Sequence, residues 1–196
     1  PERYAFDRTT SVMKAVAGAN VGGTPITADM IGDNTIMPLK FPFGVEKRTY
    51  SMFDSSLMKG APVAFVGEDT VLGLPVYKFE QKVDAQKVGV NQGMDQWYQN
   101  DQVMYVEPVT GQIVNGSSTE KVWLKNADGT DGLVVIDGTL AFTQDNVAAA
   151  VDQAKANVAK LTLVSTILPL VALVLGALAL IGGFLLLRRR PAAVES

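Results

Sequence analysis

The sequence predicts a mainly β protein, in which an antiparallel β-meander ectodomain is followed by one long C-terminal helix that continues as a transmembrane helix. Three observations predict this fold class. Runs of β-branched and aromatic residues, cut by turn residues, fill residues 2–142 of the 196-residue chain. The hydrophobic period then changes from that of a strand to that of a helix. Residues 161–187 finally form an apolar run without any charge.

The strands are predicted from alternating apolar residues that are bounded by Gly, Pro, Asn and Asp. Short turns at Thr110-Gly111 and at residues 126–129 join consecutive strands, which favours an antiparallel meander. The polar segment 84–102 is instead expected to be an irregular excursion. The clearest strands are residues 48–54, 62–68, 75–83, 103–109, 112–115, 121–125 and 133–142.

A helix is predicted to follow Thr143, whose hydroxyl can cap its first turn, and Asp145 there meets the positive end of the helix dipole. Apolar residues in this helix recur at steps of four and three, which is typical of a helix that packs along one side. The seam consists of Val147, Val151, Ala154, Val158 and Leu161. One interpretation is a long helix packed against a second helix; the other is that any helix rich in Ala and Leu matches such a pattern.

Small residues near the same register indicate where two helix backbones could approach each other inside a membrane. The candidates for helix packing are Ala172, Gly176, Ala179 and Gly183. Pro169 precedes them and is expected to kink the helix, because proline removes one backbone hydrogen bond.

Residues 161–187 can cross a bilayer, because a hydrocarbon core of roughly 30 Å needs about 20 apolar residues. Arg188, Arg189 and Arg190 follow directly, and basic residues collect on the cytoplasmic side of membrane helices. We therefore expect a plasma-membrane protein with a cytoplasmic C-terminus. The predicted domains are an extracytoplasmic β domain (1–142), a juxtamembrane helix (143–160), a transmembrane helix (161–187) and a short basic cytoplasmic tail (188–196).

The composition argues against enzymatic and metal-dependent functions. The chain has no His and no Cys, which removes the usual proton shuttle, the thiol nucleophile and almost every transition-metal site. The sequence also has neither a catalytic constellation nor a glycine-rich phosphate loop, so we expect no enzyme, no cofactor and no metal. The net charge of −3 favours no nucleic-acid partner.

Aromatic residues are the remaining candidates for a binding surface. Most of them alternate within predicted strands, which is typical of a core. The alternative is that a curved sheet exposes an apolar face to a lipid or a partner. The candidates for such a partner or lipid face are Phe41, Phe43, Trp97 and Tyr98.

Six motifs, taken together and in order, resemble the actinobacterial PorA-type porin family over essentially the whole chain. They are RYAFDR (3–8), FPFGVEKRTY (41–50), YSMFDSSL (50–57), GLPVYKFEQ (73–81), YVEPVTGQIV (105–114) and DGTLAFT (137–143). The resemblance implies an envelope membrane protein and, by the family name, a channel. It also implies an N-terminal membrane helix and an earlier part of the ectodomain. Because the chain begins Pro1-Glu2-Arg3 without an export segment, we expect it to be incomplete at its N-terminus.

The leading functional hypothesis is a non-enzymatic, membrane-anchored β domain that is a structural or accessory subunit of a larger cell-envelope complex. Its expected partners are the lipid bilayer and other membrane helices, either its own N-terminal helix or those of a partner subunit. One alternative is a module that binds a lipid or glycolipid. The other is the channel that the family name implies, although a barrel needs several strands of about ten residues and most of the predicted runs are shorter.

Overall fold

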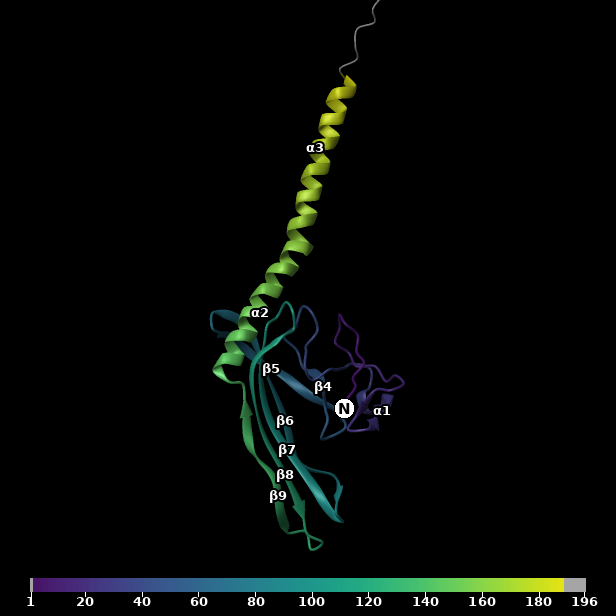
Figure 1. Ribbon diagram of the computed structural model, residues 1–196, viewed down its shortest axis with the longest axis vertical. Helices are drawn as coiled ribbons and strands as arrows, with labels where there is room; N and C mark the ends of the chain where they lie inside the picture. Colours follow the sequence, from purple (N-terminus) through teal and green to yellow (C-terminus); the bar gives the residue numbers. More distant parts are fainter. Residues whose placement is uncertain (1, 189–196) are drawn as a thin grey trace, which may run out of the picture. The chain divides into compact units, whose positions relative to one another are not determined.

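The computed structural model describes residues 2–188, and the chain divides into two compact units, residues 1–155 and 156–196. The first unit is built around one β-sheet, and the second is helical. The expected fold class, a mainly antiparallel β protein with one long C-terminal helix, is confirmed (Figure 1).

The sheet of the first unit has seven strands in the order β3-β4-β5-β6-β7-β8-β9, so strands that follow each other in sequence also pair in space. All neighbours are antiparallel except β3 and β4, which confirms the meander. A small hairpin, β1 (Asn20–Val21) with β2 (Thr24–Pro25), and the short helix α1 (Ala28–Ile31) precede it. The seven strands are Thr35–Ile36, Tyr50–Asp54, Lys59–Val71, Leu74–Asn91, Met94–Val106, Ile113–Lys125 and Asp131–Ala141.

The strands are longer than the sequence indicated. β6 has 18 residues, and β5, β7 and β8 have 13 each, so the argument from short strands against a channel is wrong. The segment 84–102 is also no irregular excursion, because it forms the ends of β6 and β7 and the turn between them. Gln92 and Gly93 both have positive φ, as a type I′ hairpin turn requires.

One face of the sheet carries the main core. Phe41, which precedes the sheet in sequence, is fully buried, and its ring centroid lies 4.6 Å from that of Phe79 in β6. The Phe41 N–H donates to the Gly111 carbonyl oxygen at 2.9 Å, and the Ser11 hydroxyl donates to the Phe41 carbonyl oxygen at 2.9 Å. These bonds hold the segment that carries Phe41 over the sheet. The other buried members of this cluster are Ile36, Val45, Tyr50, Met52, Val63, Met104 and Val106.

A second cluster holds helix α2 (Gln144–Thr162) against the sheet. The Thr143 hydroxyl accepts a hydrogen bond from the Asn146 N–H at 3.3 Å, which agrees with the predicted cap. Val147, Val151 and Ala154 are buried with Val71, Leu74, Val76 and Val114. The expectation that a second helix covers this part of the seam is therefore wrong, because the sheet itself covers it.

The second unit continues the helix. A π-helical turn, η1 (Leu163–Ile167), separates α2 from α3 (Leu168–Arg188) and ends two residues before Pro169, which cannot donate a backbone hydrogen bond. The helical run 144–185 is the one helix of residues 2–188 that is long and apolar enough to cross a membrane. The boundary expected between residues 160 and 161 lies inside this run and stays a prediction. The tail expected over residues 188–196 lies, from Arg189 on, outside the described residues.

Candidate functional site

The last strand of the meander, β9, forms a long free edge of the sheet. It pairs with β8 on one side, and within the described residues no strand pairs with its other side. Leu133, Val134, Val135 and Ile136 are each 47–66% exposed, and Leu140 is 73% exposed. Because consecutive side chains of a strand point to opposite faces, β9 exposes apolar groups on both of its faces.

A long apolar edge of this kind is a template for pairing, because its free N–H and C=O groups can bind another strand. β9 carries two charged residues, and both already have partners. The Trp123 indole N–H donates to Asp131 Oδ1 at 3.0 Å, and Lys121 Nζ lies 3.9 Å from Asp137 Oδ2. Both carboxylates of β9 thus contact side chains of β8. The apolar side chains of β9 remain available to contact another polypeptide.

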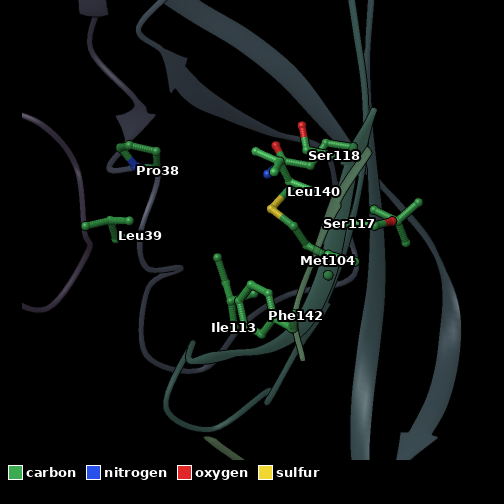
Figure 2. A pocket seen from close by; sticks show the side chains of 12 residues that line it. Pro38, Leu39, Met104, Ile113, Ser117, Ser118, Leu140 and Phe142 are labelled. Carbon is green, nitrogen blue, oxygen red and sulfur yellow. The ribbon is translucent and has the colours of Figure 1, made fainter. Parts of the chain in front are cut away.

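An apolar groove of about 330 Å³ opens next to the C-terminal end of β9. It lies between the loop of Pro38 and Leu39 and the strands β7, β8 and β9, and Figure 2 shows open space between the two sides. No lining residue is charged. The lining consists of Pro38, Leu39, Gln102, Val103, Met104, Ile113, Gly116, Ser117, Ser118, Leu140, Ala141 and Phe142.

The register of the sheet brings the groove residues together. Met104 of β7 pairs with Gly116 of β8, and the Phe142 N–H donates to the Gly116 carbonyl oxygen at 3.1 Å. Gly116 has no room for a side chain, because an added Cβ would lie 2.7 Å from the Val103 carbonyl oxygen. Met104, Gly116 and Phe142 therefore lie in one row across three neighbouring strands. Gly116, which has no side chain, lies between the side chains of Met104 and Phe142.

Two cations lie close to the loop that bounds the groove. Lys40 directly follows the groove residue Leu39, and its Nζ is 3.7 Å from the ring centroid of Phe43. Partial burial and the neighbouring positive charge of Arg8 both lower the pKa of Lys40. Among residues 2–188, no ion pair of Arg8 or Lys40 with a carboxylate occurs within 4.0 Å. Neither side chain therefore has an ion-pair partner among the described residues.

The structure does not bring the four predicted aromatic residues to one face. Phe41 and Tyr98 are buried, so they are core side chains and cannot contact a partner directly. Phe43 is partly exposed beneath Lys40. Trp97 lies with its ring centroid 6.1 Å from that of Trp123, and Lys125 Nζ lies 3.9 Å from its centroid.

The predicted helix-packing residues all lie in α3, and their partner stays a prediction. Within residues 2–188, no group of three or more His, Cys, Asp and Glu side chains could hold a metal ion. Sequence reasoning placed residues 133–142 in a strand but missed their exposure. Two signals could have revealed it: four consecutive apolar residues from Leu133, and their position in the last strand of a meander, which has an edge.

The fold and the apolar helix define a membrane-associated protein with a β domain. The profile of the family described as Porin PorA matches residues 1–185, and the chain belongs to this family. The resemblance found from the motifs is thereby confirmed, and membership indicates a protein of the cell envelope.

Two named relatives are called Porin PorA. The protein from Corynebacterium resistens is 32% identical over a match that covers 42% of this chain and 22% of the relative. The protein from Corynebacterium amycolatum is 25% identical, over 63% of this chain and 43% of the relative. The chain thus spans less than half the length of either relative. Their names describe a porin and no enzyme.

Proposed function

We propose that this chain is a non-enzymatic, membrane-anchored β domain that acts as a structural or accessory subunit of a larger envelope assembly. It joins a second polypeptide by adding that polypeptide's strand to β9. The observation that carries the proposal is the 11-residue edge strand with apolar side chains exposed on both faces. Soluble domains usually blunt such an edge with charges, proline or a covering segment.

Strand addition would use the free backbone N–H and C=O groups of β9 and its exposed apolar side chains. Main-chain hydrogen bonds would give affinity, and alternate side chains would give specificity through the apolar contacts on each face. β3, at the other end of the sheet, has only two residues, so β9 offers the longer ladder. The apolar helix supports anchoring in the plasma membrane, with the β domain on the extracytoplasmic side as the arginines after residue 187 predict.

The proposal is tested on the full chain in its native membrane. A photoreactive phenylalanine analogue at Val135, which is half exposed in β9, is expected to form a covalent adduct with one polypeptide in stoichiometric amount. The same analogue at Val90, an exposed residue of β6, is the matched control. Hydrogen exchange gives an independent readout, since the amides of residues 131–141 would be slower in the purified assembly than in the isolated chain. Equal adduct yields at both positions, with unchanged exchange, would refute strand addition.

A second function, channel formation, is favoured by the name of the two relatives. Planar-bilayer recording of the purified chain tests it directly. Conductance steps from the chain alone would support a channel and would argue against a purely accessory role, whereas silent bilayers would leave the assembly role as the better account.

A further inference from the structure

We infer that the polypeptide strand added to β9 carries an aromatic side chain opposite Gly138, flanked by apolar side chains opposite Ile136 and Leu140. The inference rests on the proposed strand addition and names the sequence pattern that β9 selects in its partner. A partner strand without this pattern would contradict the inference and leave strand addition intact.

Gly138 is the one glycine in strands β1–β9 that the chain's own structure does not require. Its φ is not positive and its pairing with Glu120 is regular, so neither a turn nor a β-bulge requires glycine there. An added Cβ would meet no atom within 4 Å. Glycine inside a strand weakens the strand and often marks a place where another group approaches closely. The other strand glycines are explained by crowding atoms, at Gly60, Gly116 and Gly132, or by a β-bulge, at Gly67 and Gly89.

Gly138 leaves a gap in a row of exposed apolar side chains. Ile136, Gly138 and Leu140 pair with β8 without a bulge between them, so all three share one face of the sheet. Ile136 is 47% exposed and Leu140 is 73% exposed. At about 3.3 Å per residue, their Cα atoms lie about 13 Å apart along the strand, with no side chain between them. The gap is open to solvent, and it lies on the edge strand to which a partner strand would be added.

An aromatic side chain fits this gap better than an aliphatic one. A side chain opposite Gly138 has Ile136 and Leu140 as diagonal neighbours at about 7–8 Å, a separation that aromatic and long side chains can span. An aromatic side chain opposite an edge glycine also covers the exposed glycine backbone, which is a known way to stabilise a sheet edge. Glu120 lies behind Gly138 on the same face, and its carboxylate would face the positive edge of the ring.

The opposite face of this stretch of β9 is polar. Lys121 Nζ lies 3.9 Å from Asp137 Oδ2. The hydroxyls of Thr119 and Thr139 share a hydrogen bond of 2.8 Å. The residues of an added strand that lie opposite Asp137 and Thr139 are therefore expected to be polar, because side chains directly opposite each other interact. The pattern expected opposite residues 136–140 is apolar, polar, aromatic, polar, apolar, which reads the same for parallel and antiparallel addition.

The partner's sequence tests this pattern directly. A photoreactive phenylalanine analogue at Val135 of the full chain, in the native membrane, forms an adduct that tandem mass spectrometry can sequence after digestion. We expect an aromatic residue about three positions from the crosslinked one, since Gly138 follows Val135 by three, with apolar residues two positions to either side. A partner peptide without such an aromatic residue would overturn the inference and still support strand addition. Absence of a specific adduct would overturn both.

Substitutions at Gly138 test the gap itself. Gly138→Val would occupy the space of the partner's ring and is expected to lower the yield of the Val135 adduct by up to about tenfold, the weight of one aromatic contact. Gly138→Ala should have a smaller effect. The isolated Gly138→Val chain should be at least as stable as the wild type in urea unfolding, because valine favours strands more than glycine does. Gly89→Val, at an exposed position of β6 where an added Cβ also meets no atom within 4 Å, is the matched control.

Three results of these substitutions would count against the inference. An unchanged adduct yield in Gly138→Val would show that no partner side chain lies over Gly138. Equal losses in Gly138→Val and Gly89→Val would trace the effect to the sheet as a whole. A loss of adduct that is matched by a loss of stability in the isolated Gly138→Val chain would assign glycine a role inside the chain.

Discussion

The hydroxyl of Tyr98 donates a hydrogen bond to Asp54 Oδ2 at 2.9 Å, and both residues are buried. The bond joins β7 to the end of β4, although β5 and β6 lie between these strands in the sheet. Asp54 Oδ1 in turn accepts the N–H groups of Ser56 and Leu57 at 2.8 and 3.0 Å. One carboxylate thus shapes the β4–β5 turn and ties it to the middle of the sheet. Burial and the charge of Asp54 raise the pKa of Tyr98, which keeps the phenol protonated as the donor.

Tyr98→Phe is expected to lower the free energy of unfolding by about 1–3 kcal/mol, because it leaves a buried carboxylate oxygen without its donor. Urea unfolding of the detergent-solubilised chain, followed by the fluorescence of Trp97 and Trp123, measures the change. Tyr4→Phe is the matched control, since it removes an exposed bond to Glu2 Oε2 and should cost less than about 0.5 kcal/mol. Equal stability of the wild type and Tyr98→Phe would show that water replaces the phenol.

Glu120 predicts a pH dependence of stability. Burial and the nearby negative charge of Asp54 raise the pKa of Glu120. The folded state therefore binds more protons than the unfolded state between the unfolded and the folded pKa, so the free energy of unfolding falls as pH rises through this window. Glu120→Gln is expected to be more stable than the wild type at pH 7, and the difference should shrink as the pH falls through the window. Urea titrations at pH 4, 5, 6 and 7 measure it; a difference that grows toward low pH would contradict the assignment.

The helix α2 is expected to depend on its seam with the sheet. Val151 is fully buried against the second cluster, so Val151→Ala should destabilise the β domain by about 1.5–3 kcal/mol through lost burial and the cavity left behind. Gln153→Ala, at an exposed position of the same helix, is the control and should change stability by less than about 0.5 kcal/mol. Equal effects of the two substitutions, in the same urea assay, would mean that α2 does not stabilise the sheet.

The order of the strands could be predicted from sequence because turn chemistry is local. Thr110 and Gly111 lie in the β7–β8 connection, and residues 126–129 lie between β8 and β9, as expected. The end of β6 could not be predicted from hydrophobic alternation, because most side chains of residues 84–91 are exposed, and the start of β7 consists mainly of polar residues. Backbone hydrogen bonds between β6 and β7 form the strands there, and these bonds depend little on which side chains are present.

The candidate site was harder to predict, because tertiary contacts decide which apolar residues are free. Phe41 and Phe43 have similar sequence contexts, yet the bond from Phe41 N–H to Gly111 places Phe41 in the core, while Phe43 remains partly exposed. The groove needs Leu39 next to strands far along the chain, and no periodicity encodes such a neighbourhood. Val147, Val151 and Ala154 of the predicted seam are buried, whereas Leu161 is exposed. The sheet that covers these three residues was not predicted, because a helix period identifies a buried side without identifying what covers it.

The stripe of Ala172, Gly176, Ala179 and Gly183 is expected to pack against another membrane helix. An added Cβ at Gly176 or Gly183 meets no atom within 4 Å, so leucine at these positions causes no clash inside the chain itself. Any loss of association therefore reports contact with another helix, since bulk on this face prevents close approach of two backbones. Gly176→Leu with Gly183→Leu should weaken the assembly by about 1–2 kcal/mol, measured as the dissociation of co-purified subunits during stepwise dilution in mild detergent.

Val174→Leu is the matched control for this double substitution. At 3.6 residues per turn, Val174 lies on the side of α3 opposite to Gly176 and Gly183, and it adds bulk to an exposed position. Dissociation should then follow the wild type. If the double glycine variant dissociates at the same dilution as Val174→Leu and the wild type, the stripe faces lipid, and the assembly depends on contacts outside α3.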